Sequence, residues 1–121
     1  MRIKWIATLG MAAMAAAAGA HHSFAMFDMK KEAAAQGAVT DFKWTNPHAW
    51  MHVDVPNPDG STTNWAFEMT SPNNLVHSGW RRSSLKPGDK VKVTYHPLVN
   101  GKPGGALMKV VLPNGTTLEN K

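Results

Sequence analysis

The sequence predicts an all-β domain with one short helix, folded as a small five-stranded barrel of the OB-fold type. Between residues 37 and 112, apolar residues alternate at period two in short runs that turn residues separate. The one segment with helix signals lies between the third and fourth runs, which is the element order of an OB-fold. A small open sandwich of the same strands is the alternative. We favour the barrel because a closed sheet has no exposed edges.

The first three strands are expected at residues 37–44, 50–55 and 63–69. The first strand ends at Asn46-Pro47, and the turn at residues 57–60 makes the second and third strands a hairpin. Alternate side chains of a strand point to opposite faces. One face of the second and third strands carries Met51, Val53, Val55, Trp65, Phe67 and Met69. The opposite face carries Trp50, His52, Asp54 and Glu68.

A short helix is predicted at residues 71–79, between the third and fourth strands. Ser71 is a good N-cap, Pro72 suits the first helical position, and Gly79 is placed to end the helix.

The fourth and fifth strands are expected at residues 91–96 and 106–112. Asn114-Gly115 closes the fifth strand, and the tail that follows is polar. The barrel domain therefore spans residues 37–121. Residues 21–36 form an N-terminal arm, in which the stretch 30–35 predicts either a helical turn or an irregular lead-in.

Residues 1–20 are predicted to be a cleaved signal peptide, which indicates that the protein is exported. Arg2 and Lys4 precede an apolar run, and Ala18-Gly19-Ala20 provides small residues at the cleavage site. The alternative, a membrane anchor, needs about 20 strongly apolar residues, and this run is short and rich in alanine. Cleavage after Ala20 is favoured, although cleavage after Ala18 or Ala25 is also compatible with the sequence.

The composition restricts the chemistry that the exported chain can perform. The chain has no cysteine, so any metal site must use histidine, carboxylate, methionine or backbone groups. Loss of Arg2 and Lys4 lowers the formal charge from +5 to +3, a balance that does not suggest nucleic acid as a partner. No nucleophile elbow, phosphate loop or HExxH motif is present, so catalysis is poorly supported.

Cleavage after Ala20 leaves His21 as the first residue, with its amine and its imidazole available to chelate one ion. One further imidazole, from His48 or His52, completes three nitrogens in a T shape, a set that suits Cu(II). His22 can serve instead of His21 or beside it. Met26 and Met29 are soft thioethers of the kind that hold Cu(I). The alternative is a polar chain end, with both methionines packed against the barrel.

A second candidate site is the outer face of the second strand with its neighbour. Trp50, His52, Asp54 and Glu68 can form a surface for a sugar, another flat ligand or a partner protein. The alternative is an ordinary solvated strand face. His77, in the predicted helix, is expected to be structural or inert.

Several sequence blocks occur in a fixed order along nearly the whole exported chain. They are His21-His22-Ser23-Phe24, Asp28, Trp44-Thr45-Asn46-Pro47-His48, Trp65-Ala66-Phe67-Glu68-Met69, Ser71-Pro72-Asn73, Gly79-Trp80 and Ser84-Leu85-Lys86-Pro87-Gly88-Asp89. Together they resemble the small exported bacterial proteins of domain-of-unknown-function family 6152. The resemblance implies export, with the periplasm as the expected compartment, and a small β-rich domain, and it brings no activity or cofactor. Met26-Phe27 departs from the family pattern, in which a small residue and an acid are usual.

The sequence thus predicts an exported, non-enzymatic binding protein with a histidine-rich N-terminal metal site, with copper as the expected ion. Its expected partners are a metal ion or small ligand and an envelope protein, with no membrane anchor after cleavage. The alternative is a metal-free interaction module of the OB-fold type, and a small copper-dependent oxidase is a weaker alternative.

Overall fold

The computed structural model describes residues 25–121 of the chain. The predicted signal peptide and both N-terminal histidines, His21 and His22, lie outside the described residues. In the described part, no helix is both long enough and apolar enough to cross a membrane. The elements in chain order are β1 (Ala33–Lys43), β2 (Trp50–Pro56), β3 (Thr62–Glu68), α2 (Pro72–His77), β4 (Lys90–Pro97), β5 (Gly104–Val111) and β6 (Thr117–Glu119).

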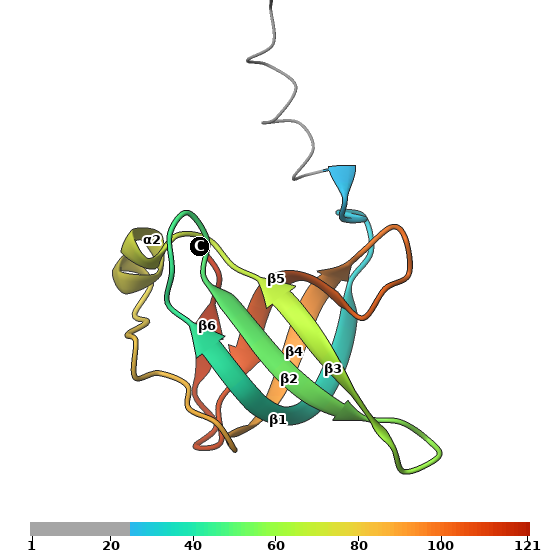
Figure 1. Ribbon diagram of the computed structural model, residues 1–121. Coiled ribbons are helices and arrows are strands. Elements are labelled where there is room, and N and C mark those ends of the chain that lie inside the picture. The colour runs from blue at the N-terminus through green and yellow to red at the C-terminus, as the bar shows by residue number, and fades with distance from the viewer. Residues whose placement is uncertain (1–24) are drawn as a thin grey trace, which may run out of the picture.

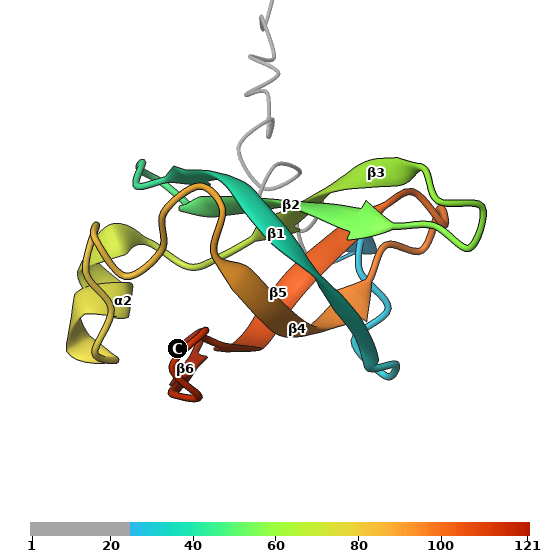
Figure 2. The same ribbon diagram turned by 90° about the horizontal axis from the view of Figure 1, so that it is seen from below.

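Strands β1 to β5 form a closed barrel, and this confirms the predicted fold class (Figures 1 and 2). The strand order is β3-β2-β1-β4-β5-β6, and β5 also pairs with β3 to close the ring. All other pairings are antiparallel, but β3 and β5 run parallel, with Ala66 opposite Gly104 and Glu68 opposite Ala106. Residues at the C-terminal end of β3 therefore lie beside the start of β5.

Strand β1 bends across the barrel and serves two neighbours. Its first half pairs with β4, from Ala33 opposite Tyr95 to Ala38 opposite Lys90, and its second half pairs with β2. A register shift between Val39 and Asp41 marks a bulge, which bends a strand locally. At Gly37 a Cβ atom would lie 2.1 Å from the carbonyl oxygen of Asp54, so the bend requires glycine.

The predicted inward-facing residues of β2 and β3 line the barrel interior. Met51, Val53 and Phe67 are fully buried, and Trp65 packs against them while remaining partly accessible. The period-two pattern is therefore confirmed on both strands. The other buried apolar residues come from all parts of the barrel and its helix, and they are Val39, Ala49, Met69, Leu75, Trp80, Leu85, Val91, Val93, Tyr95, Leu107 and Val110. Burial raises the pKa of the Tyr95 phenol.

Helix α2 and strand β6 lie at the same end of the barrel (Figures 1 and 2). The helix is shorter than predicted, but the predicted cap is confirmed, because Asn74 donates its backbone N–H to Ser71 Oγ at 3.3 Å. Just after the helix, Trp80 Nε1 donates a hydrogen bond of 2.8 Å to the carbonyl oxygen of Glu119. The C-terminal residues thus hold the segment that follows the helix.

Two stretches differ from the sequence-based expectation. A helical turn or an irregular lead-in was expected at residues 30–35, but residues 33–35 form the start of β1, because β4 offers a free edge to which they hydrogen-bond. The tail was expected to be only polar, but Thr117–Glu119 pairs with β5. Asn114-Gly115 is therefore a hairpin turn between β5 and β6, as this dipeptide favours.

Candidate functional site

His48 and Glu68 form a close pair of polar side chains at the barrel rim. His48 lies in the loop between β1 and β2, and Glu68 is the last residue of β3. Backbone hydrogen bonds join the loop to the end of β3, because Ala49 donates to Thr70 and Met69 donates to Ala49. This short ladder holds His48 beside Glu68, and His48 Nδ1 lies 2.6 Å from Glu68 Oε1.

The hydrogen bond to Glu68 determines which ring nitrogen of His48 can bind a ligand. An ionised carboxylate only accepts hydrogen bonds, so Nδ1 carries the proton and donates it. In the neutral imidazole, Nε2 then holds a lone pair. Within residues 25–121 no hydrogen bond engages Nε2. The His48 side chain is 43% exposed, so Nε2 can be reached from solvent.

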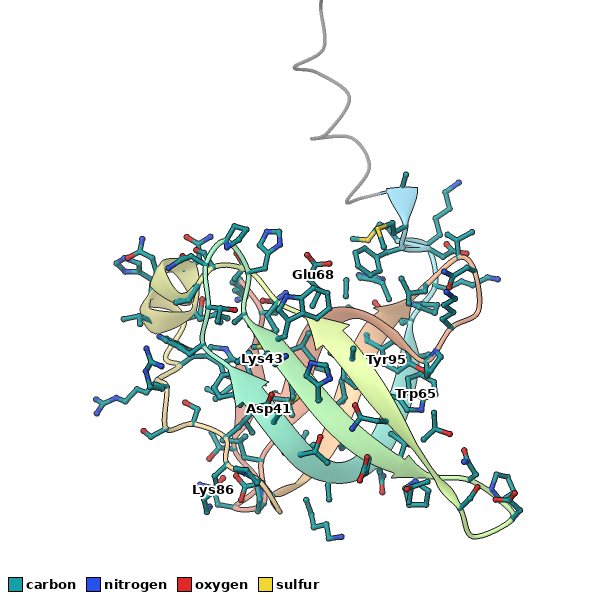
Figure 3. All side chains as sticks on the ribbon, in the orientation of Figure 1. Asp41, Lys43, Trp65, Glu68, Lys86 and Tyr95 are labelled. Atoms are coloured by element: carbon teal, nitrogen blue, oxygen red, sulfur yellow. The ribbon has the colours of Figure 1, made fainter. Side chains whose placement is uncertain are left out.

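A cavity of about 210 Å³ opens beside this pair. Its walls come from five regions: the N-terminal arm, the 44–49 loop, the end of β3 with the residues that follow it, the start of β5 and the segment after β6. Glu68 points out from the end of β3 into the space between the loop and the arm (Figure 3). The lining residues are Phe27, Met29, His48, Glu68, Met69, Thr70, Ala106 and Asn120.

The arm is fixed against the loop that joins β4 to β5. Val99 donates its backbone N–H to Met26, and Asp28 donates to Pro97. His96 Nδ1 donates a hydrogen bond of 2.8 Å to the carbonyl oxygen of Lys31. These bonds place Phe27 and Met29 at the cavity that His48 also lines.

The outer faces of β1, β2 and β3 carry a separate polar network. Asn64 is central to it, because its Nδ2 donates to Asp54 Oδ1 at 2.9 Å and to Thr40 Oγ1 at 3.0 Å. Its Oδ1 lies 3.3 Å from Nδ1 of His52. His52 and Asp54 are therefore joined through Asn64, away from the cavity that His48 lines.

Trp50 lies between the cavity and the network. It is directly opposite Glu68 on β3 and Lys43 on β1, so the three side chains share one face (Figure 3 labels Glu68 and Lys43). Trp50 is only partly buried and does not belong to the residues that pack on the core. Trp44 packs against the core, and Trp80 is part of it.

The structure brings together some of the predicted site residues and separates others. His48 and Glu68 form one pair, and His52 and Asp54 belong to another group. Asp54 lies opposite Asn64, four residues from Glu68 along β3, or about 13 Å at the rise of a strand. In residues 25–121, no three His, Cys, Asp or Glu side chains gather closely enough to hold a metal ion. His77 is exposed on α2.

Sequence reasoning missed three contributors to this region. Met69 was assigned to the core, and it is buried, but it also lines the cavity. Asn120 lies in the tail that was expected to be only polar, and its side chain accepts from the Thr70 N–H and donates to the Leu107 carbonyl oxygen, each at 2.8 Å. His96 anchors the arm. Among these three residues, only Asn120 has a sequence signal: Asn114-Gly115 favours a hairpin, which brings Asn120 back to the barrel.

Comparison with known proteins gives a family for this chain. No curated protein and no solved structure matches it. The model of a family of unknown function, DUF6152, matches residues 9–108, which is most of the chain and includes β1 to β4, α2 and the start of β5. The resemblance predicted from the sequence blocks is thus confirmed, and the chain belongs to family DUF6152.

Proposed function

We propose that this protein is exported to the periplasm and binds a copper ion at the barrel rim without catalysing a reaction. His21, as the first residue of the processed chain, supplies its amine and its imidazole, and His48 supplies the third nitrogen. His22 can replace His21 as the imidazole donor. Such a set of three nitrogens suits the tetragonal preference of Cu(II). Storage or delivery of the ion is the role that follows from binding without catalysis.

The observation that carries the proposal is the 2.6 Å hydrogen bond from His48 Nδ1 to Glu68 Oε1. Histidines that ligate metals usually donate their other ring N–H to a carboxylate or carbonyl, which fixes the ring and makes the ligating nitrogen more basic. His48 has this arrangement. Because its Nδ1 is bonded to Glu68, Nε2 is the ring nitrogen left to bind the ion. Glu68 is the orienting group in this proposal and does not bind the ion.

The position of the arm gives the second support. Phe27 lines the same cavity as His48, and His21 precedes Phe27 by six residues. Six residues of chain span at most about 20 Å. The connection is therefore long enough for the amine of His21 to meet His48 Nε2 at the cavity.

His52 is less suited to be the third donor. Its Nδ1 contacts Asn64, whose amide is also bonded to Asp54, so the ring is part of the outer-face network. It does not line the cavity beside the arm. This difference makes His52 a matched control for His48, because both are partly buried histidines close together in the chain.

The first test compares two forms of the processed protein by calorimetric titration with Cu(II). One form begins at His21, and the other carries four extra residues, so that neither His21 nor His22 is first or third in the chain. We expect the extension to weaken Cu(II) binding by about 100-fold or more, because losing a ligand costs more affinity than the roughly 10–100-fold lost when a group that only orients a ligand is removed. Equal affinities would contradict the proposal, as would an envelope-derived protein whose intact mass places its first residue beyond His22.

The same titration identifies the third nitrogen. His48→Ala is expected to lower the affinity of the His21 form by at least about tenfold, whereas His52→Ala leaves it unchanged. Both variants should keep the thermal unfolding midpoint within a few degrees, since neither ring is in the core. The reverse ranking of the two variants would assign the third nitrogen to His52 and overturn the rim site.

The outer face supports a second candidate function, a metal-free interaction surface for a small molecule, a glycan or a partner protein. Trp50 is partly exposed, flanked by Lys43 and Glu68, and close to a hydrogen-bonded polar network. Aromatic side chains with polar neighbours are typical of binding surfaces. Under this hypothesis Trp50→Ala abolishes retention of an envelope partner or glycan in a pull-down but preserves Cu(II) uptake. Identical retention by Trp50→Ala and the unchanged protein would exclude it.

A further inference from the structure

Two methionines from different parts of the chain line the rim cavity. Met29 comes from the anchored arm, and Met69 directly follows β3. His48 lines the same cavity. The sequence had suggested that Met26 and Met29 act together, but Met26 is not among the lining residues. The fold instead pairs Met29 with a methionine 40 positions away.

The two methionines differ in how exposed their side chains are and in how firmly they are held. Met69 is 2% exposed, so its side chain is held by the core around it. Met29 is 48% exposed, although its backbone segment is fixed by the hydrogen bonds of Asp28 and Lys31. An exposed, unbranched methionine side chain adapts to a ligand at little cost. One donor is therefore rigid and the other adjusts.

We propose that the rim cavity binds Cu(I) through the sulfurs of Met29 and Met69 and through Nε2 of His48. Thioether ligands select Cu(I), because soft donors match a soft ion. The remaining lining is largely uncharged, with Phe27 and Ala106 beside the donors, and this disfavours hard ions such as Mg²⁺ and Ca²⁺, which need several charged oxygen ligands. The inference rests on the proposed copper function, since it assigns a second oxidation state of the same metal to the same rim.

The site needs no ligand from the residues before Ala25, so its test is independent of the N-terminal histidines. Glu68 has the same role whether Cu(I) or Cu(II) is bound. It orients the His48 ring through its hydrogen bond, and its carboxylate is not a soft donor. The neutral donors leave the bound Cu(I) with its single positive charge, which the nearby Glu68 carboxylate balances.

The test is an anaerobic competition between the processed protein and a chromogenic Cu(I) chelator. Met29→Leu is the decisive variant, because it conserves volume on an exposed side chain and removes only the sulfur. We expect it to weaken Cu(I) binding by at least about tenfold. Met26→Leu is the matched control, since Met26 is also exposed, lies three residues away and should leave binding unchanged. Equal affinities of the Met29→Leu and Met26→Leu variants would overturn the proposal.

Two further measurements separate this inference from the Cu(II) proposal. The four-residue extension before His21 should weaken Cu(II) binding only, and Met29→Leu should weaken Cu(I) binding only. X-ray absorption of the Cu(I)-loaded protein should contain copper–sulfur scattering that decreases in Met69→Leu, whose folding is checked by its unfolding midpoint. Loss of Cu(I) affinity on extension, with none in Met29→Leu, would place Cu(I) at the chain end and refute the cavity site.

Discussion

Trp80→Ala is expected to lower the free energy of unfolding by about 3–5 kcal/mol, the usual cost of removing a large aromatic side chain from a core. Trp80 is 1% exposed, and its ring centroid lies 6.0 Å from that of Phe42 on β1. The indole N–H also donates to the Glu119 carbonyl oxygen, which joins the segment after α2 to β6. Alanine therefore leaves a cavity and an unpaired carbonyl at the same point.

Urea unfolding followed by circular dichroism measures this loss. Trp80→Phe separates the two contributions, because it keeps most of the ring volume and removes the N–H, and it should cost about 1–3 kcal/mol. Val76→Ala, in the preceding helix α2 and 56% exposed, should stay within about 0.5 kcal/mol of the unchanged protein. If Trp80→Ala were no more destabilising than Val76→Ala, Trp80 would not be a core residue.

Gly104→Ala is expected to destabilise the protein by about 3 kcal/mol or more, because it prevents closure of the barrel. A Cβ atom there would lie 2.3 Å from the carbonyl oxygen of Ala66, which is backbone and cannot rotate away. The φ angle of Gly104 is also +150°, a value that favours glycine. Gly104 lies opposite Ala66 where β5 meets β3, so the only parallel pairing among the described strands depends on it.

The effect of Gly104→Ala should reach the rim cavity as well. The register that places Gly104 beside Ala66 also places Ala106 beside Glu68, and both of these line the cavity. We therefore expect weaker Cu(I) binding in addition to a lower thermal midpoint. Gly60→Ala is the control: its φ is +89°, but a Cβ there meets nothing within 4 Å, and it should cost about 1 kcal/mol. Equal midpoints for the two variants would mean that β3 and β5 do not meet at Gly104.

Many elements of the fold were predictable because their signals are local. Alternating apolar residues gave the faces of β2 and β3, and Ser71 with Pro72 gave the start of α2. The start of β1 was not predictable, because Ala33–Gln36 has weak strand propensity and becomes strand only by pairing with β4. Strand β6 is three residues long and depends on the free edge of β5 in the same way.

The candidate site was predictable in its residue types but not in its grouping. His48, Glu68 and Met29 were each singled out for their chemistry. No local pattern places His48 with Glu68 rather than with His52, since contacts between residues distant in the chain leave no such pattern. Neither did it indicate Met69 as a cavity residue, because an apolar residue on a core face is normally just buried.

The amino-acid sequence alone determined most of the secondary-structure elements and their order, and it determined the family. It also determined which nitrogen and sulfur donors are available in a chain without cysteine. Tertiary structure decided which donors meet. Closure between β3 and β5 brings Glu68 to Ala106, and the backbone hydrogen bonds of Ala49 bring His48 to Glu68. The hydrogen bond from His96 to Lys31 holds the arm, so that Met29 lines the same cavity. These contacts arise from burial and hydrogen bonding across the whole barrel, which depend on the three-dimensional packing of segments and not on their spacing along the chain.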